Sequence, residues 1–251
     1  MTAFDLSGRW AIVTGANTGI GQAIAVGLAK AGADIVGVGR SAMAETEAEV
    51  KASGRRFVSV TADLSKSGSA ANALSEALAV GATPDILVNN AGIIRRADSL
   101  DFTEEDWDAV LDTNLKSVFF LCQAFGRAAL AAGRPAKIIN IASMLSFQGG
   151  IRVPSYTAAK SGLAGITKLL ANEWAARGIN VNAIAPGYVE TNNTTALRAD
   201  AERNADILKR IPAGRWARPE DMAGAAIFLA SPASDYVHGT ILPVDGGWLA
   251  R

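Results

Sequence analysis

The sequence predicts a single α/β domain whose seven-stranded parallel sheet carries helices on both faces, an arrangement called doubly wound. Two observations predict it. Short β-branched runs alternate with segments in which apolar residues recur every three or four positions, as strands alternating with helices require. No Pro/Ser-rich linker, low-complexity tract or repeat divides the 251 residues, and 49% hydrophobic residues are enough for one sizeable core.

The expected strands are apolar, β-branched and bounded by turn-forming or polar residues. They comprise residues 10–14, 34–39, 56–61, 85–89, 137–141, 180–185 and 241–244. Helical periodicity separates them: Ile20, Ile24 and Leu28 share one face of the first helix. Strands regularly separated by helices imply crossover connections and therefore a parallel sheet. Residues 188–218 are polar and helix-prone, and we interpret them either as a lid over a ligand crevice or as an ordinary helical excursion.

Composition excludes several partners. The 24 basic residues balance the 24 acidic ones, so charge gives no reason to expect nucleic acid or an anionic membrane as a partner. The single cysteine, Cys122, permits no intrachain disulfide and suits a reducing compartment. Neither a signal-peptide pattern nor a run of about eighteen apolar residues is present, so we expect a cytoplasmic protein without a membrane span.

The histidine content restricts the chemistry. His238 is the only histidine, so a histidine-rich zinc site is impossible and no metal site is expected. A Ser-His-Asp hydrolase requires that this one residue lie at the site. Proton transfer is therefore expected mainly from Tyr, Lys, Asp, Glu or Ser side chains.

A glycine-rich turn follows the first expected strand. Gly15 permits the sharp turn into the helix, while Gly19 and Gly21 let the backbone approach a diphosphate and pack closely. The amino end of the next helix then offers free N–H groups and a positive dipole to an anion. The spacing, GxxxGxG, predicts a dinucleotide site; the alternative is a glycine-rich turn that binds nothing.

Small and polar residues close the next strands along the chain. Asp63 and Leu64 end the third strand within reach of an adenine ring, although Asp63 suits a helix N-cap equally well. Asn90 and Gly92 follow the fourth strand and face the same crevice, or else serve turn chemistry alone.

Arg40 ends the second strand, where a carboxylate would bind a ribose 2′-hydroxyl and favour NAD. Because an arginine can pair with a 2′-phosphate instead, we favour NADP and keep NAD as possible. Thr18 supplies no second positive charge, and Arg40 stacking on adenine is the alternative.

Tyr156 and Lys160 stand one helical turn apart and share a face. A free phenol has a pKa of about 10 and is a poor proton relay at neutral pH, whereas an ammonium and an oxidised nicotinamide are positive partners that could stabilise its anion. Ser143, just past the fifth strand, can donate to a carbonyl oxygen, and Asn114 stands in a helical segment that asparagine does not favour. Alternatively, Tyr156 and Lys160 form a solvated helix face, Ser143 is a turn residue and Asn114 is a polar packing residue.

These residues together resemble the short-chain dehydrogenase/reductase family, whose members have a Rossmann-type fold, across essentially the whole chain. The resemblance implies that Tyr156 is the catalytic acid/base, that Ser143 orients the carbonyl, that Lys160 binds the nicotinamide ribose, and that Asn114 helps to hold a relay water. With the residues argued above, the expected cofactor contacts are Gly15, Asn17, Thr18, Gly19, Ile20, Gly21, Arg40, Asp63, Leu64, Asn90, Gly92, Tyr156, Lys160, Pro186, Gly187, Val189 and Thr191.

A finer likeness is to the sugar-acid dehydrogenases of that family, carried by residues 93–96, 141–156, 185–188, 191–194 and 244–251. It implies interconversion of a ketone and a secondary alcohol on a keto-deoxy sugar acid. The alternatives are another uronate-derived ketone, a gluconate-type substrate and, in a different class, a non-catalytic dinucleotide-binding sensor. A sensor has no chemical reason to retain Tyr156 with Lys160.

Arginines near the crevice suggest an acidic substrate. Arg152 or Arg96 could bind a carboxylate with a planar fork, with Ser143 and Gln148 as further tentative substrate contacts; solvated surface arginines are the alternative. The family resemblance also implies a homotetramer. The apolar tail at residues 246–250 suits a subunit contact, or packing on its own core.

Overall fold

The computed structural model describes residues 3–79 and 81–250; residues 1, 2 and 251, which the sequence analysis also used, lie outside the described part. One sheet has the order β3-β2-β1-β4-β5-β6-β7, and all its pairings are parallel. The strands are β1 (Trp10–Thr14), β2 (Asp34–Gly39), β3 (Phe57–Thr61), β4 (Ile86–Asn89), β5 (Ala136–Ile141), β6 (Ile179–Pro186) and β7 (Ile241–Val244). The predicted fold class is confirmed, and each strand end lies within one residue of its expected position.

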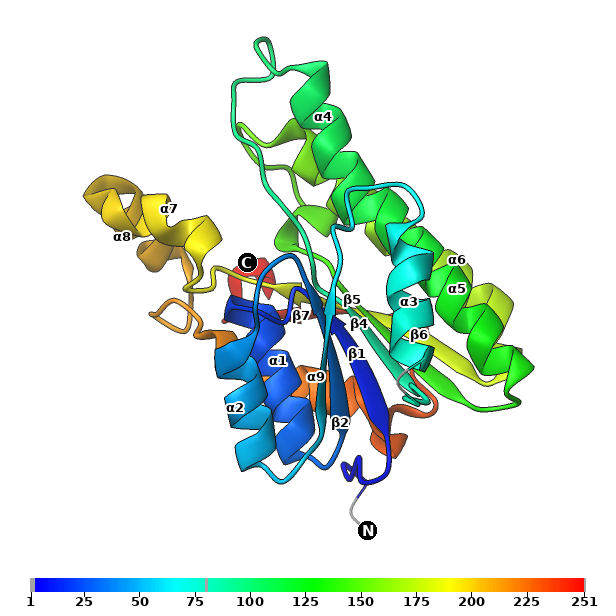
Figure 1. Ribbon diagram of the computed structural model, residues 1–251. Coiled ribbons are helices and arrows are strands. Elements are labelled where there is room, and N and C mark those ends of the chain that lie inside the picture. The colour runs from blue at the N-terminus through cyan, green and yellow to red at the C-terminus, as the bar shows by residue number, and fades with distance from the viewer. Residues whose placement is uncertain (1–2, 80, 251) are drawn as a thin grey trace.

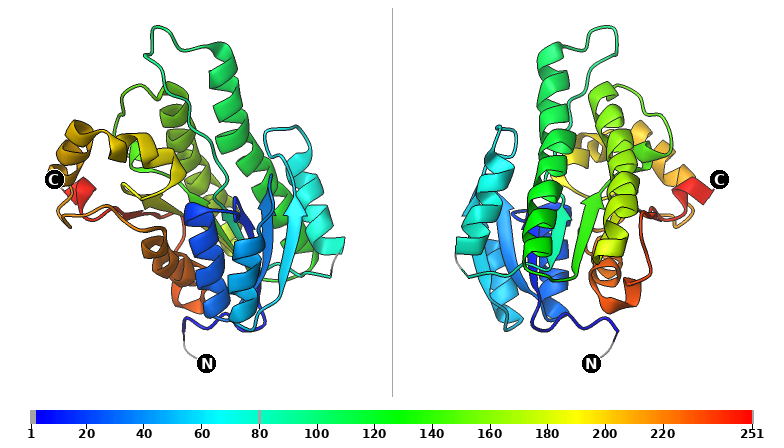
Figure 2. Two further views of the ribbon diagram at one scale, coloured as in Figure 1. Left: turned by 60° about the vertical axis from the view of Figure 1, so that its left-hand side comes forward. Right: turned by 90° about the vertical axis from the view of Figure 1, so that its right-hand side faces the viewer.

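Helices cover both faces of this sheet (Figure 1). The α-helices are α1 (Gly19–Lys30), α2 (Ala44–Ala52), α3 (Ser69–Ala79), α4 (Glu104–Leu111), α5 (Ser117–Ala131), α6 (Pro154–Trp174), α7 (Thr195–Ala199), α8 (Ala201–Arg210) and α9 (Ala223–Ala230). Helices α1, α2 and α9 pack on one face, whereas α3, α5 and α6 stand side by side on the other (Figure 2). None of the helices in the described residues is long and apolar enough to cross a membrane.

Two cores result from the strand alternation. In β1, Ala11 and Val13 belong to the core under α1 and α9, while Trp10 and Ile12 belong to the core under α3, α5 and α6. Successive side chains of a strand point to opposite faces, so an apolar strand covered on both sides serves both cores. That double burial is why these strands read as continuous apolar runs.

The strand order reverses beside β1, which pairs with β2 on one side and with β4 on the other. In open parallel sheets ligands bind outside the carboxyl ends of the strands at such a switch point. The turn after β1 and the segment after β4 therefore face one crevice.

Residues 188–218 leave the sheet after β6 and return next to their starting point. Glu190 N–H donates to Ala217 O at 2.9 Å and Ala217 N–H to Tyr188 O at 2.9 Å. Between these contacts lie helices α7 and α8, which stand beside the C-terminal turn in each view (Figures 1 and 2). A small separate core containing Trp216 and Trp248 joins α8 to that turn. Residues 246–250 therefore pack on their own chain, which is one of the two arrangements expected from the sequence; the other was a subunit contact.

Candidate active site

A cleft of about 700 Å³ opens at the carboxyl ends of the strands. Most of the cofactor contacts expected from sequence line it. These are Gly15, Asn17, Thr18, Gly19, Ile20, Arg40, Asp63, Leu64, Asn90, Gly92, Tyr156, Lys160 and Thr191. The cleft thus collects residues from six segments that are far apart in the chain.

The turn after β1 has the geometry of an anion site. Gly15 and Gly19 have φ of +66° and +58°, in the region that disfavours side chains. Helix α1 begins at Gly19 with no side-chain cap on its free N–H groups and no acidic residue in its first turn. Free donors and a positive helix end fit the diphosphate of a dinucleotide.

Gly21 has a packing role instead. A Cβ there would lie 2.1 Å from Gly15 O and 2.4 Å from Asn90 Nδ2, so any side chain would push the helix off the turn. Asn90 in turn donates to Thr14 O at 3.0 Å, which ties the end of β4 to the turn after β1. The third glycine of the motif therefore supports the cleft without lining it.

The far end of the cleft is built by β2 and β3. Arg40 is exposed at its rim, and its charge helps to lower the pKa of Asp63, an effect due first to the hydrogen bonds from Ser65. Asn17 Nδ2 donates to Ser41 Oγ at 3.0 Å, holding the glycine turn against the end of β2. Arg40 makes no ion pair with a carboxylate of the described residues, so its guanidinium is open to an anionic ligand.

Tyr156 and Lys160 lie together at the other end. They stand in the first two turns of α6, which starts with Pro154 at a position where a missing N–H costs nothing. Lys160 Nζ lies 5.5 Å from the centroid of the Tyr156 ring and donates to Ile141 O at 2.6 Å. Ser143, just past the end of β5, lies near enough to Tyr156 to lower the pKa of its phenol. The phenol, ammonium and hydroxyl therefore form one cluster.

The pKa values in this cluster follow burial. Burial raises the pKa of Tyr156, although the Ser143 hydrogen bond and the Arg96 charge act in the opposite direction. Burial also lowers the pKa of Lys160 to about 8. Positive partners are expected to stabilise the phenolate, and the charge of Arg96 acts in that direction. Lys160 lies beside the ring with its Nζ hydrogen-bonded to Ile141 O.

Asn114 lies in a π-helical turn, Asp112–Lys116, that joins α4 to α5. Its side chain is completely buried: Oδ1 accepts from Ile93 N–H and Nδ2 donates to Ile93 O, both at 2.8 Å. A wider turn is the reason asparagine stands inside a helix here, since π turns interrupt the regular ladder. The two hydrogen bonds hold Ile93, which lines the cleft, so Asn114 shapes the cleft wall through that backbone.

Four expected cofactor contacts do not line the cleft. Gly21 lies below the turn, and Val189 is 3% exposed in the bridge to Ala217. Pro186 ends β6, and a Cβ on Gly187 would lie 2.6 Å from Asp245 Cα. These residues lie at the base of the 188–218 excursion, whereas Thr191, near its start, does line the cleft.

The candidate substrate residues separate into two groups. Arg96 Nη2 donates to Asn193 O at 3.0 Å, and Asn193 lines the cleft. Arg152 has a strained φ of +63° and pairs with Asp98 at 3.4 Å. Gln148 Oε1 accepts from Trp248 Nε1 at 3.2 Å and from Arg210 Nη2 at 3.4 Å. Arg96 is therefore directed to the site, while Arg152 and Gln148 have partners elsewhere.

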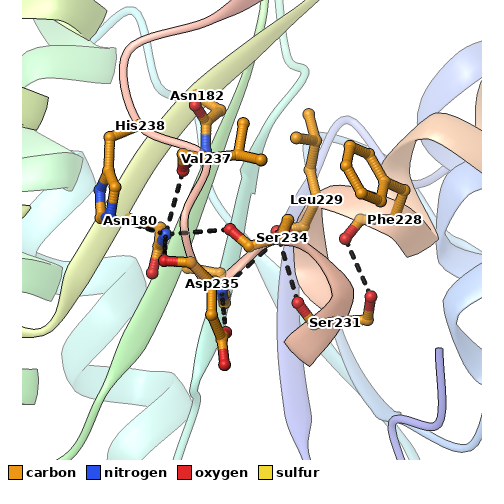
Figure 3. A network of polar contacts seen from close by, with 10 residues as sticks. Asn180, Asn182, Phe228, Leu229, Ser231, Ser234, Asp235, Val237 and His238 are labelled. Atoms are coloured by element: carbon orange, nitrogen blue, oxygen red, sulfur yellow. Dashed lines mark hydrogen bonds and ion pairs between the residues drawn. The ribbon is translucent and has the colours of Figure 1, made fainter. Parts of the chain in front are cut away.

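His238 lies at the opposite end of the sheet. Its Nε2 lies 3.3 Å from Nδ2 of Asn180, the second residue of β6, in a network at the amino ends of the strands (Figure 3). A Ser-His-Asp arrangement with Ser143, beyond the carboxyl end of β5, is therefore excluded. No group of three or more metal-binding side chains occurs in residues 3–79 and 81–250.

Several cleft residues went unpredicted from sequence. Ser41, Ile93, Thr113, Asn192 and Asn193 all line it. Ser41 directly follows Arg40, and the two asparagines directly follow Thr191, so adjacency to a predicted contact was an available signal. Thr113 carried no local signal, because the π turn that contains it depends on tertiary contacts. Ile93 belongs to the 93–96 segment of the finer likeness, although it was not assigned to the cleft.

A glycine turn with free helix donors, opposite a tyrosine–lysine pair and a serine, defines a nicotinamide-dinucleotide-dependent oxidoreductase. The family model described as Enoyl-(Acyl carrier protein) reductase matches residues 15–249. The chain belongs to the short-chain dehydrogenase/reductase family.

Individual relatives cover the whole chain. The 2-dehydro-3-deoxy-D-gluconate 5-dehydrogenase of Escherichia coli is 60% identical over 251 residues, 100% of this chain and 99% of that protein. An NADP-bound crystal structure from Agrobacterium tumefaciens, provisionally named 2-deoxy-D-gluconate 3-dehydrogenase, is 63% identical with a TM-score of 0.96 and full coverage of both chains. A gluconate 5-dehydrogenase from Burkholderia cenocepacia, in complex with NADP and tartrate, is 41% identical with a TM-score of 0.93, covering 99% and 98% of the two chains.

Proposed function

We propose that this protein reversibly interconverts a ketone and a secondary alcohol on a keto-deoxy sugar acid, using NADP. The observation that carries the proposal is the cluster of Tyr156, Lys160 and Ser143 at one end of a dinucleotide-sized cleft. Its full-length similarity to 2-dehydro-3-deoxy-D-gluconate 5-dehydrogenases supports the substrate class.

Tyr156 is the proposed acid/base. Its hydroxyl can donate a proton to a carbonyl oxygen during reduction. Burial raises the pKa of this phenol, and Ser143 and the Arg96 charge act against that rise. Ser143 can donate to the same oxygen as negative charge develops on it. Lys160, held by Ile141 O, lies where its ammonium can bind a ribose and stabilise the phenolate after transfer.

The cofactor residues fit a dinucleotide along the cleft. The turn from Gly15 to Gly19 would hold the diphosphate, and Asp63 with Leu64 the adenine. The dinucleotide supplies the hydride in one direction and accepts it in the other. Arg40 supports NADP over NAD, because β2 ends without a carboxylate and the guanidinium forms no ion pair with an Asp or Glu of the described residues.

Arg96 is the better candidate for the substrate carboxylate. Its guanidinium bonds Asn193 at the cleft, and its charge acts on Tyr156. Arg152 remains the second candidate, although its ion pair with Asp98 must first be broken. We further propose that residues 188–218 act as a lid, since Thr191, Asn192 and Asn193 border the cleft.

A homotetramer is proposed for the assembly. Apolar side chains are exposed along α4, α5 and α6: Trp107 is 41%, Phe120 49% and Leu169 48% exposed. A hollow of about 330 Å³ lies between α5 and α6 beside Leu169. Exposed apolar side chains beside such a hollow suit contact between copies of the chain. A cytoplasmic location stays a prediction.

The test is a substrate panel. Purified protein is mixed with NADPH or NADH and with 5-keto forms of 3-deoxygluconate, an unsaturated-uronate ketone and 5-ketogluconate, while nucleotide absorbance is followed. The highest kcat/KM is expected for the keto-deoxy acid with NADPH. A preference for NADH contradicts the role of Arg40, and a higher value for another ketone transfers the proposal to that substrate. Dinucleotide binding without turnover of any ketone would support a sensor.

A further inference from the structure

A chain of buried polar side chains crosses the core directly below the cleft. Asn89 Nδ2 donates to Asn140 Oδ1 at 2.9 Å, and Asn140 Nδ2 donates to Thr167 Oγ1 at 3.0 Å. Thr167 Oγ1 donates onward to Leu163 O at 2.8 Å. Asn140 and Thr167 are fully buried and Asn89 is 3% exposed. Strands β4 and β5 are thereby joined to helix α6 through side chains.

Each member of this chain neighbours a residue of the site. Asn89 precedes Asn90, which holds the glycine turn, and Asn140 precedes Ile141, whose carbonyl accepts from Lys160. Thr167 stands seven residues, two helical turns, after Lys160, so both side chains leave the same face of α6. Two hydrogen bonds from one helix face thus meet adjacent residues of one strand.

Apolar packing alone does not fix this register. Around the polar chain, α6 rests on the sheet through Leu163 and Leu170, both in the core that also contains Ile138. Apolar contacts are non-directional and tolerate small shifts, whereas a buried hydrogen bond is lost within a few tenths of an ångström. An unpaired buried donor costs about 1–3 kcal/mol, so displaced registers of the helix are disfavoured.

We propose that the Asn140–Thr167 hydrogen bond is a positioning device for the reaction. It sets α6 on β5 so that Lys160 meets Ile141 O and Tyr156 meets Ser143. Asn140 and Thr167 touch neither substrate nor cofactor, and they act through the two residues of the helix that do. The inference rests on the proposed function of Tyr156 and Lys160.

The test uses Thr167→Val, which keeps the shape and removes the hydroxyl, and Thr167→Ser, which keeps the hydroxyl. Thr167→Val is expected to lower kcat about tenfold to hundredfold, because small displacements of reacting groups cost that much. The Kd for NADPH is expected to rise by less than kcat falls, since Lys160 is only one of the residues that line the cofactor cleft. The KM for the ketone is expected to stay within about twofold. Thr167→Ser is expected to retain most of kcat.

Ile179→Val controls for stability. Ile179 is fully buried at the amino end of β6, in the core that also contains Leu170 of α6, and losing one methyl group there costs about 0.5–1.5 kcal/mol without removing a hydrogen bond of the Asn140–Thr167 chain. It is expected to lower Tm while leaving kcat unchanged. An equal fall of kcat in Ile179→Val and Thr167→Val, or no fall in Thr167→Val, overturns the proposal.

A crystal structure of Thr167→Val gives a readout that needs no activity. Lys160 Nζ is expected to leave hydrogen-bond range of Ile141 O, from 2.6 Å in the present structure. An unchanged contact overturns the proposal even if kcat falls. If the wild-type protein turns over none of the ketones, the proposed function fails, and the position of Lys160 still decides the positioning claim.

Discussion

The two ends of the sheet use polar side chains in opposite ways. At the amino ends, charged groups are paired within the chain: Asp34 with Arg56 at 2.7 Å, Lys137 with Asp235 at 2.6 Å, and Asp85 with Arg134. At the carboxyl ends, Lys160, Arg40 and Arg96 make no ion pair with a carboxylate of the described residues.

The asparagines show the same contrast. Asn180 Nδ2 donates to the carbonyls of Ser234, Asp235 and Val237 and closes the network at the amino ends (Figure 3). Asn90, at a carboxyl end, lines the cleft that it helps to hold open. Paired groups stabilise the fold, whereas unpaired charges at the cleft weaken it slightly and await an anionic ligand. The two ends therefore differ in what a substitution should change.

Among the substitutions, Tyr156→Phe, at the carboxyl ends of the strands, is expected to have the largest effect on kcat. Removing the hydroxyl deletes the proton donor, so kcat should fall about 10²–10⁴-fold. The ring stays in place, so Tm and the Kd for NADPH should change little. Tyr236→Phe, at a fully exposed tyrosine, is the control and should behave as wild type. Turnover near the wild-type rate in Tyr156→Phe would refute the acid/base assignment.

Asn180→Ala, at the amino ends of the strands, is expected to change stability and leave turnover intact. It leaves the carbonyls of Ser234, Asp235 and Val237 without their shared donor. The free energy of unfolding should fall by about 2–4 kcal/mol, measured by urea unfolding. Per folded molecule, kcat should remain within about twofold. A tenfold loss of kcat at unchanged stability would mean that the two ends are not separate in function.

Sequence was sufficient for the sheet and for most of the cleft. The central strand β1 is apolar on both faces, so its pattern and its core assignment agree, as the two cores around Ala11 and Ile12 show. The glycine turn and the Tyr156–Lys160 pair were readable because both are local in sequence, set by a turn and by one helical turn.

The remainder depends on tertiary contacts that no local pattern records. In the π turn, the amide of Asn114 bonds the backbone of Ile93, 21 residues away. Arg96 and Arg152 looked equivalent in sequence, and the structure separates them through Asn193, 97 residues from Arg96, and through Asp98. The pKa of Tyr156 likewise depends on packing, because burial raises it while Ser143 and the charge of Arg96, distant in sequence, lower it.

The arginine pair gives a smaller effect that sharpens the contrast between paired and unpaired charge. Arg96→Gln should raise the KM for the keto acid about tenfold or more, since a guanidinium–carboxylate contact contributes about 1.5–3 kcal/mol. Arg152→Gln, whose parent residue pairs with Asp98, is the matched control and should leave that KM nearly unchanged. Both variants should retain the Kd for NADPH. An unchanged KM in both variants would show that neither arginine binds the substrate carboxylate. A rise only in Arg152→Gln would assign the carboxylate to Arg152 in place of Arg96.

The smallest effect concerns pH, and it tests whether the unpaired lysine must be charged. Burial lowers the pKa of Lys160 to about 8, so the ammonium is present below that pH and is lost as pH rises through it. The kcat/KM for NADPH reports groups of the free enzyme and should fall on the alkaline side, reaching half its plateau near the pKa of Lys160. The phenol of Tyr156 keeps its proton over this range because its own pKa is raised. A Lys160→Arg variant that still binds NADPH should lose the alkaline decline, since a guanidinium does not titrate there. A wild-type profile that stays level to about pH 10 would instead show that the neutral amine suffices, and the lysine would then act by its hydrogen bonds alone.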